Sequence, residues 1–428
     1  MEYRQSIFFA QEEIFGKLGL SHNIYKSYKE KFINITQLLS RELENKKVAP
    51  FKPMFEESTH AVYRDIIHKY QKFKTVFIVG TGGSTLGAQS LYDLLAIKQK
   101  NYPKLVFLDN IDSKTIRAVL SQYRLEETGV FVVSKSGKTI ETISIMLVLI
   151  EAYRKKMGAE SHQKYFAILT AFNNNPLHRY ANNHNLTCIP HSEDIGGRFS
   201  IFSNVALLPA AFCGVDIESF CAGGRELIKN FTSISTIEDN HPLYGAFFLI
   251  SCLEQKKISN HVMMPYIDRL KGFVRWYKQL CAESLGKNGS GITPIDAFGT
   301  IDQHSQLQLY LEGPSDKVFT VIVNGNHHSE IHIENQGFEY FDFLEGKSLN
   351  EIMTLQQQST IQSLVKKGRP VRVLSLSHLD EKMLGMLSAH FILEVLISAK
   401  ILNINPYDQP AVDNGKELAY QAFRKIAS

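Results

Sequence analysis

The sequence lacks the features that mark membrane-spanning, secreted and nucleic-acid-binding proteins. Its longest apolar stretches, such as Ile143–Ile150 and Val205–Val215, fall well short of the roughly 18 residues that suggest a membrane span. The first residues read MEYRQSIFFAQEE, in which charges surround a very short apolar patch, so the pattern of a signal peptide is missing. A net charge of +4, from 47 Lys and Arg against 43 Asp and Glu, gives no support for nucleic-acid binding. We therefore expect a cytoplasmic protein with neither a membrane nor a nucleic acid as partner.

Cysteine is scarce and scattered. The five cysteines are odd in number and show no C-x-x-C spacing, which favours reduced and mostly buried thiols: Cys188, Cys213, Cys221, Cys252 and Cys281. The sequence also lacks an H-x-x-x-H pattern and any cluster of Cys and His at metal-ligand spacing. We therefore expect no metal ion.

What is present is an alternation of buried-strand and helix patterns over a length that suits two or three domains. Strands are predicted at Thr75–Val79, Lys104–Leu108, Val130–Val133, Phe166–Thr170 and Thr187–Ile189. A second unit starts near His241, with strands at Val262–Pro265, Val318–Val323 and Val371–Leu374, and helices at Ile267–Leu285, Leu349–Val365 and Lys382–Ala399. Residues 1–50 carry only helical patterns, at Gln11–Leu18 and Ile33–Leu43. The prediction is an α/β fold of two doubly wound units with parallel sheets and helical segments at both ends.

The stretch Val130–Ile145, VFVVSKSGKTIETISI, is the most informative in the chain. A strand there leads through a hydroxyl-rich turn into a helix, so free backbone N–H groups, the positive helix end and the hydroxyls of Ser134, Ser136 and Thr139 come together. The arrangement suits an anion such as a phosphate monoester, although an ordinary helix cap would look similar. It is not a P-loop, because that motif needs a glycine where Val132 stands.

A glycine-rich loop, Gly80–Gly87, follows the first strand. A dinucleotide-binding fingerprint would need a third glycine where Thr85 stands, so a nicotinamide-dependent dehydrogenase is disfavoured. A tight turn that lets backbone N–H groups approach a small ligand explains Gly83 and Ser84 better. Because this loop and the Ser134 loop both follow parallel strands, they emerge on one rim of the sheet, where such folds bind ligands.

Four further strings carry polar groups. In Asp194–Ser200, DIGGRFS, the glycines allow close backbone approach and Arg198 offers a fixed positive fork. On the helix Ile267–Leu285, Gln279 and Glu283 lie opposite the apolar face, either in solvent or in a cleft between the two units. The remaining strings are Gly299–Gln306, with an imidazole at His304, and the proline-punctuated Pro406–Glu417, which leads into a short helix carrying Lys416.

Taken together and in this order, these motifs resemble the glucose-6-phosphate isomerase family, whose members contain two sugar-isomerase (SIS) domains. The resemblance covers the chain from about residue 50 to the end. It implies two SIS domains (51–235 and 236–405) and a C-terminal segment (406–428) that completes the active site, whereas the N-terminal helical arm (1–50) lies outside the resemblance. It also implies the reversible isomerisation of glucose 6-phosphate and fructose 6-phosphate through a cis-enediol intermediate, without a cofactor.

The resemblance assigns roles at matched positions. Glu283 corresponds to the base that moves a proton between C2 and C1, Arg198 to the group that stabilises the enediolate, and His304 and Lys416 to the groups that open the ring. The matched substrate contacts are Gly83, Ser84, Ser134, Lys135, Ser136, Thr139, Gly197, Gln279 and Gln409. The family's site is completed across a dimer interface, which implies a homodimer with His304 contributed by the neighbouring subunit.

The chain departs from the family at Ala411 and Asp413, which replace the usual Gly and Glu, and at Thr81 and Thr85 of the first loop. Two alternatives stay open at this point. One is a non-catalytic SIS protein that senses sugar phosphates, which would need neither Glu283 nor His304. The other is a dual phosphoglucose and phosphomannose isomerase, because the sequence does not show how C2 stereochemistry is read.

Overall fold

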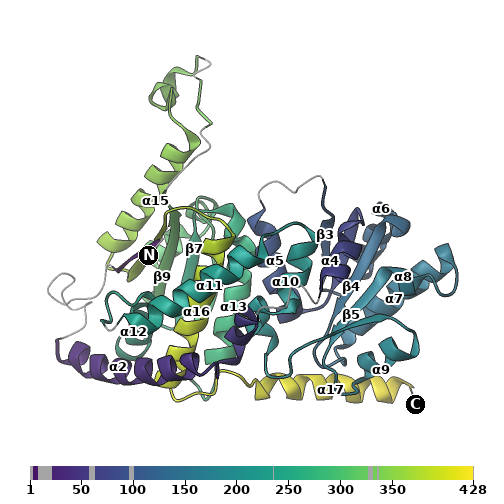
Figure 1. The fold of residues 1–428 in the computed structure, drawn as a ribbon. Helices are drawn as coiled ribbons and strands as arrows, with labels where there is room; N and C mark the ends of the chain where they lie inside the picture. The colour runs from purple at the N-terminus through teal and green to yellow at the C-terminus, as the bar shows by residue number, and fades with distance from the viewer. Residues whose placement is uncertain are drawn as a thin grey trace.

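A computed structural model describes residues 3–7, 22–56, 63–95, 101–234, 236–325, 331–334 and 337–427. Two α/β units lie side by side, each built on a sheet that is covered by helices on both faces (Figure 1). The chain starts at the second unit and ends on a helix that runs beneath the first. The predicted α/β architecture with two sheets is confirmed.

The first unit holds five parallel strands in the order β3-β2-β4-β5-β6. Their bounds are β2 (Thr75–Val79), β3 (Lys104–Leu108), β4 (Thr128–Val133), β5 (Phe166–Thr170) and β6 (Thr187–Pro190). Its helices include α4 (Arg64–Gln71), α5 (Leu86–Leu94), α6 (Ser113–Gln122), α7 (Ile140–Met157), α8 (His162–Tyr165), α9 (Pro176–Asn183), α10 (Asn204–Phe212) and α11 (Ile217–Ser233). Every predicted strand of this unit is present.

The second sheet has the order β1-β10-β9-β7-β8. Its strands are β7 (Asn260–Pro265), β8 (Thr293–Asp296), β9 (Lys317–Asn324) and β10 (Val371–Leu376), which are parallel, and β1 (Tyr3–Ile7), which pairs with β10 in antiparallel direction. The helices are α12 (His241–Lys256), α13 (Lys271–Leu285), α14 (Leu307–Glu312), α15 (Leu349–Lys366) and α16 (Glu381–Ile401).

Strand β1 corrects the prediction that residues 1–50 are only a helical arm. The arm does contain α2 (His22–Glu44), which includes the predicted helix at Ile33–Leu43, whereas the predicted helix at Gln11–Leu18 lies outside the described residues. β1 covers the free edge of β10 and so completes the sheet of the second unit.

One apolar core joins the two units. Because side chains alternate across a strand, Val76 and Ile78 of β2 face this shared core, whereas Phe77 and Val79 face a separate cluster beneath α6 and α7. The two faces of the second sheet also belong to different clusters: one face contributes to the shared core, and the outer face packs on α14 and α15. The inner faces of both sheets therefore pack on one set of helices, which fixes the two units against each other.

Helix α16 is long and apolar enough to cross a membrane, but 94% of its apolar segment is buried inside the fold. It carries part of a buried ionic cluster, in which Arg372 of β10 donates to both oxygens of Glu394, and the side chains are 0% and 1% exposed. His390 contacts Glu394 at 3.1 Å, and Tyr3 of β1 contacts the His390 ring at 2.7 Å. Burial would raise the pKa of Glu394, but Arg372 and His390 hold it at about 2. α16 is thus the central helix of a folded core.

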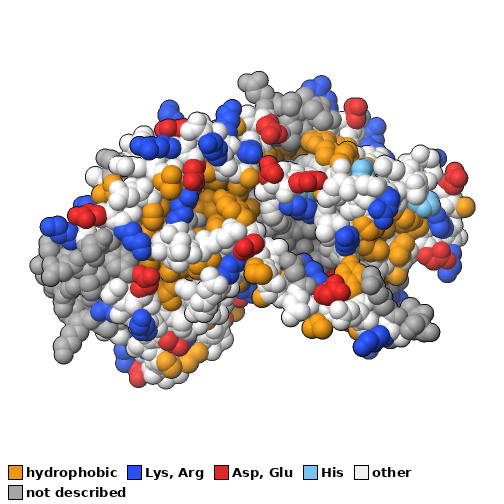
Figure 2. Space-filling view, turned by 90° about the horizontal axis from the view of Figure 1, so that it is seen from below, with side chains coloured by type: hydrophobic (Ala, Val, Ile, Leu, Met, Phe, Trp, Pro, Cys, Tyr) orange, Lys and Arg blue, Asp and Glu red, His pale blue; other side chains and the backbone are white. Residues whose placement is uncertain are grey.

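The C-terminal helix α17 (Pro410–Ala427) is longer than the short helix that the sequence indicated. It runs along the underside of the molecule from the second unit to the first (Figure 1). Seen from that side, Lys and Arg side chains are interspersed with Asp and Glu over the described surface, with no large field of one sign (Figure 2). The mixed surface agrees with the low net charge.

Candidate active site

The site begins where β2 ends. After Val79 the chain turns through Gly80 and Thr81 into a short 3₁₀ helix, η3 (Gly82–Ser84), which precedes α5. A Cβ on Gly83 would lie 2.1 Å from the backbone carbon of Gly197, so the two glycine loops touch directly. This close approach needs glycine at Gly83 because no side chain would fit there.

The loop after β4 forms a small hydroxyl cluster at the start of α7. Ser134 is buried, and its Oγ lies 3.1 Å from Thr139 Oγ1. Thr170, at the end of β5, donates to the Ser134 carbonyl at 2.7 Å and holds the loop in place. Because Ile140 opens α7, the first N–H groups of this helix lie beside these hydroxyls. The loop therefore has the donors and the helix end that an anion site needs.

Lys135 and Ser136 are the other two predicted phosphate contacts of this loop, and neither belongs to the hydroxyl cluster. The Lys135 ammonium donates to the carbonyls of Glu193 at 2.5 Å and Ile195 at 3.0 Å, so it ties the Ser134 loop to the Arg198 loop. Burial lowers the pKa of Lys135, and the nearby acid Glu193 opposes that effect. Ser136 is exposed, and its Oγ accepts from the Lys138 amide at 3.3 Å.

Arg198 makes polar contacts with residues of α13 and of the loop before α17. It lies on the 3₁₀ helix η5 (Gly197–Phe202) and its side chain is only 2% exposed. Nε donates to Ser284 at 2.9 Å, and Nη1 donates to Glu283 at 3.2 Å and to Gln409 at 2.7 Å. Burial lowers the pKa of Arg198, whereas the neighbouring Glu283 carboxylate raises it. The guanidinium stays charged in either case.

Glu283 reaches Arg198 from the other unit. It lies on α13, four residues after Gln279, whose Nε2 donates to Glu283 Oε1 at 3.0 Å. The opposite face of the helix is buried, whereas the Glu283 side chain is 32% exposed. The pair therefore does not simply face solvent, because Glu283 contacts Arg198 of the first unit. Trp276 of the same helix donates to the Arg198 carbonyl at 3.1 Å and so helps to fix this approach.

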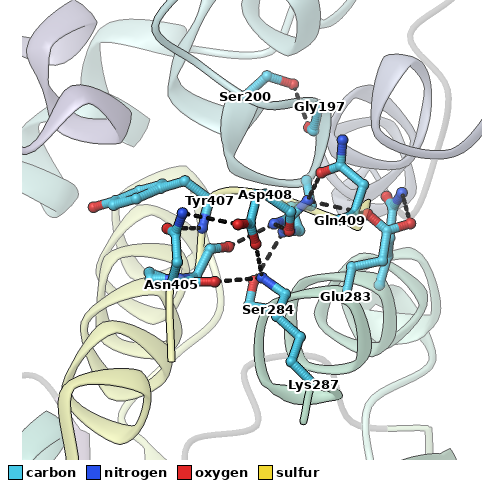
Figure 3. Close-up of polar contacts among 12 residues, drawn as sticks. Gly197, Ser200, Glu283, Ser284, Lys287, Asn405, Tyr407, Asp408 and Gln409 are labelled. Carbon is cyan, nitrogen blue, oxygen red and sulfur yellow. Dashed lines mark hydrogen bonds and ion pairs between the residues drawn. The ribbon is translucent and has the colours of Figure 1, made fainter. Parts of the chain in front are cut away.

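The loop before α17 closes the Arg198 side of the site (Figure 3). Arg198 Nη2 donates to the carbonyls of Pro406 at 2.5 Å and Asp408 at 2.9 Å. Lys287, just beyond α13, pairs with the Asp408 carboxylate at 2.8 Å and also bonds the Asn405 carbonyl. Gln409 is thereby held with its side-chain oxygen on the guanidinium.

Sequence reasoning missed three of these residues. Ser284, Lys287 and Asp408 position Arg198 and the loop around it, yet nothing in their local sequence separates them from ordinary surface residues. The available signal was the family resemblance, whose matched segments Gln279–Lys287 and Tyr407–Lys416 contain all three residues. Their pairing joins positions more than a hundred residues apart, which a local pattern cannot show.

His304 and Lys416 are both exposed side chains in the single chain. His304 follows the 3₁₀ helix η7 (Ile301–Gln303), its side chain is exposed, and no hydrogen bond or ion pair between described residues joins it to Glu283 or Arg198. Lys416 lies on the exposed surface of α17. Further along this helix, the Tyr420 hydroxyl donates to the Lys138 carbonyl, so α17 contacts the Ser134 loop.

Two doubly wound units, with a hydroxyl-rich loop at the start of α7 and a buried arginine that contacts a partly exposed carboxylate of the other unit, define a protein of the two-domain sugar-isomerase class. The comparisons with known proteins narrow this class. The phosphoglucose isomerase family model matches residues 55–428. The chain belongs to the phosphoglucose isomerase family.

Individual relatives agree with this assignment. The chain is 32% identical to the probable glucose-6-phosphate isomerase of Methanococcus maripaludis over 417 residues, which cover 96% of this chain and 92% of the relative. It is 31% identical to the glucose-6-phosphate isomerase of Campylobacter jejuni, with coverage of 96% and 97%. Among solved structures, a hypothetical protein of Thermus thermophilus superposes with a TM-score of 0.84 at 27% identity, covering 93% of this chain and 97% of that one. A glucose-6-phosphate isomerase of Chlamydia trachomatis superposes with a TM-score of 0.76 at 24% identity, with coverage of 89% and 75%, and shares the fold.

Proposed function

We propose that this protein interconverts glucose 6-phosphate and fructose 6-phosphate in the cytoplasm. The observation that carries the proposal is the contact between Arg198 of the first unit and Glu283 of the second, 3.2 Å apart. An aldose–ketose isomerase needs a carboxylate that can reach a carbon acid and a fixed positive charge where the enediolate develops. Family membership supplies the substrate pair, because the curated relatives carry the name glucose-6-phosphate isomerase.

The Ser134 loop holds the phosphate in this proposal. The hydroxyls of Ser134, Ser136 and Thr139 and the start of α7 donate to its oxygens, and the third N–H of Lys135 is available beyond the two carbonyls that it already bonds. Gly83, Ser84 and Gly197 line the sugar, and Gln279 and Gln409 bond its hydroxyls. Holding one end of the substrate turns proton transfer at the other end into a step between fixed neighbours.

In the direction from glucose 6-phosphate, Glu283 then takes the proton from C2 and returns it to C1, while the hydroxyl proton moves from O2 to O1. While the enediolate exists, its oxygen charge faces the Arg198 guanidinium, whose position is fixed by Ser284, Gln409 and two backbone carbonyls. Because these contacts are already formed in the free protein, the guanidinium does not have to reorganise when the charge develops.

Ring opening is assigned to His304 and Lys416. His304 lies on the exterior of its own chain, which supports a homodimer in which each subunit supplies His304 to the site of its neighbour. Lys416 is assigned to the same site from α17, and the contact of this helix with the Ser134 loop through Tyr420 supports that assignment.

The decisive measurement is a coupled assay of fructose 6-phosphate conversion without added metal or nucleotide. We expect turnover with fructose 6-phosphate and none with mannose 6-phosphate. Binding of the sugar phosphate without turnover would instead identify a sensor. Comparable turnover of both sugars would identify a dual isomerase.

A glycine substitution tests the phosphate loop. Gly137 has a φ of +59°, and a Cβ there would lie 1.8 Å from Asn175 Oδ1, the atom that caps α9. Left-handed backbone costs an L-residue about 1–2 kcal/mol before any clash is counted. We expect Gly137→Ala to raise the KM for fructose 6-phosphate about 10-fold or more, with a smaller effect on kcat, measured by steady-state kinetics.

Gly158 offers a matched control at the other end of α7. Its φ is +101°, but a Cβ there would meet nothing within 4 Å. Gly158→Ala should therefore cost some stability and leave the KM unchanged. Equal KM values for both variants and the unmutated protein would show that the Ser134 loop does not hold the phosphate.

A further inference from the structure

The first unit contains a polar cavity at its outer end. The cavity measures about 610 Å³ and lies beside the end of α7, the short helix α8 and the end of α9. These helices are on the side of the first unit that is turned away from the second (Figure 1). The lining residues fall within 154–163 and 183–185, so they include no residue of the candidate active site.

His162 lines this cavity and has unused hydrogen-bonding capacity. The residue is only 1% exposed, yet neither nitrogen of its ring has a hydrogen-bond partner in the described part of the chain. Its ring neighbours are Phe166 and His184, whose ring centroids are 6.4 Å and 6.0 Å away. Because a buried polar group without a partner is costly, this imidazole needs a ligand, an ion or a water molecule in the cavity.

Arg154, on the last turn of α7, brings a second unsatisfied group to the same cavity. Its Nε is buried and has no hydrogen-bond partner among the described residues. A guanidinium is always charged, and its donors match the oxygens of a phosphate group. Basic residues in the last turn of a helix also complement the helix dipole, but that role does not need a buried imidazole beside them. Arg154 and His162 together therefore indicate a bound anion.

The other charged side chains of the lining are Lys155 and Glu160, both of which are exposed. Lys155 pairs with Glu151 at 3.2 Å, whereas no ion pair between described residues joins Glu160 to Arg154 or Lys155. The remaining polar side chains of the lining are amides and an imidazole: Gln163, Asn183, Asn185 and His184. Groups that can donate therefore outnumber the single acid among these lining residues, which favours an oxyanion as the ligand.

Two helices end at this cavity, and free carbonyl groups at a helix end would repel an anion. At the end of α7 the Gly158 amide donates to the Arg154 carbonyl at 3.0 Å. At the end of α9 the Leu186 amide donates to the Ala181 carbonyl at 2.9 Å. These backbone caps reduce the negative charge that the helix ends present to the cavity.

We propose that this cavity is a separate anion site, which binds an oxyanion of the phosphate class, either free phosphate or the phosphate ester of a small metabolite. Arg154 and His162 hold the oxyanion, and the volume of the cavity leaves room for the rest of an ester. The site is distinct from the proposed substrate site, because the Ser134 loop lies at the start of α7 and this cavity lies at its end.

The protonation of His162 should report the bound anion. Burial lowers the pKa of the free ring, and Arg154 and His184 lower it further, whereas the Ala159 backbone and Glu160 oppose this shift. The ring is therefore mostly neutral near pH 7 in the free protein. A bound oxyanion stabilises the imidazolium, so the pKa of His162 should rise when the site is filled.

Nuclear magnetic resonance of the full chain, labelled with ¹³C in its histidine rings, tests the proposal. The probes are inorganic phosphate and glycerol 3-phosphate, with sodium chloride at equal ionic strength as the control. We expect the His162 signal, identified by its loss in His162→Gln, to shift with the phosphate probes and not with chloride. It should also titrate at a higher pH when a probe is bound. The probe that binds more tightly shows whether the site takes free phosphate or an ester.

Three charge variants check which groups hold the anion. Arg154→Gln should weaken binding of the probes about 10-fold or more, because a charge-assisted hydrogen bond is lost. Glu160→Gln should strengthen binding about 2-fold or more, because it removes the acid of the lining. Lys164→Gln is the matched control, since Lys164 is exposed on α8 outside the lining, and the affinity should stay within about 2-fold of normal.

The active-site loop provides a second control. Gly137→Ala alters the Ser134 loop and should leave the response of His162 unchanged. A His162 signal that ignores both probes, an equal shift with chloride, or an unchanged affinity in Arg154→Gln would overturn the proposal. Loss of the response in Gly137→Ala would also overturn it, because the shift would then arise from the proposed substrate site.

Discussion

Glu283→Gln is expected to lower isomerase turnover by between about 10² and 10⁴-fold, the usual contribution of a positioned general base. The amide keeps the size of the carboxylate, and its oxygen can still accept from Arg198 Nη1 or from Gln279. It cannot take a proton from carbon at neutral pH. The loss should therefore appear in kcat, measured in the coupled assay with fructose 6-phosphate as substrate.

Binding separates this chemical role from a structural one. Because the phosphate is held by the Ser134 loop, the Glu283→Gln protein should bind fructose 6-phosphate within about 10-fold of the normal affinity by calorimetry. Glu151→Gln is a suitable control, since that residue is on α7 and its side chain is 57% exposed. Turnover close to normal in Glu283→Gln would remove this residue from the mechanism.

Arg372→Met is expected to lower the free energy of unfolding more than any other substitution proposed for this protein. It leaves the Glu394 carboxylate, 1% exposed, without its main partner in the core of the second unit. Breaking one side of a buried ion pair typically costs about 3–5 kcal/mol. The expected result is a large drop in the urea midpoint of unfolding, followed by circular dichroism.

Two further variants test whether the unpaired buried charge causes the loss of stability in Arg372→Met. The double variant Arg372→Met/Glu394→Leu removes both charges and should recover much of the lost stability, since apolar replacement of a whole buried pair is often neutral. Lys367→Met breaks a surface pair with Glu312, whose side chains are 50% and 56% exposed, and should change stability by at most about 1 kcal/mol. Equal losses of unfolding free energy in Arg372→Met and Lys367→Met would show that the buried ion pair contributes no more to stability than the surface pair.

The sequence was sufficient for most of the sheet strands because each has a run of β-branched or aromatic residues. β2, β3 and β5 occupy the predicted residues, since both faces of these strands are covered and their apolar runs end at polar turns. The predictions missed β1 and β8, whose sequences YRQSI and TPID have little apolar character. β1 is a strand because β10 provides a partner, and that partner is found only when the whole chain is folded.

For the site, too, local sequence was sufficient for some residues and not for others. Local patterns identified the Ser134 loop and the polar face of α13, since a turn composition and a helical period are visible in short windows. The meeting of Arg198 with Glu283 and Gln409 depends on contacts across 85 and 211 positions, and only the family resemblance pointed to it. The roles of His304 and Lys416 remain predictions that rest on this resemblance.

Strand β1 can pair only after β10 has been synthesised, which constrains the order of folding during translation. Ile7 pairs with Arg372, and this partner leaves the ribosome only after the intervening part of the chain has been synthesised. At 5–20 residues per second the first strand waits on the order of 20–70 s without its partner. During synthesis the first unit can fold while the second lacks β10, so β1 must stay free of wrong pairings until β10 has been made.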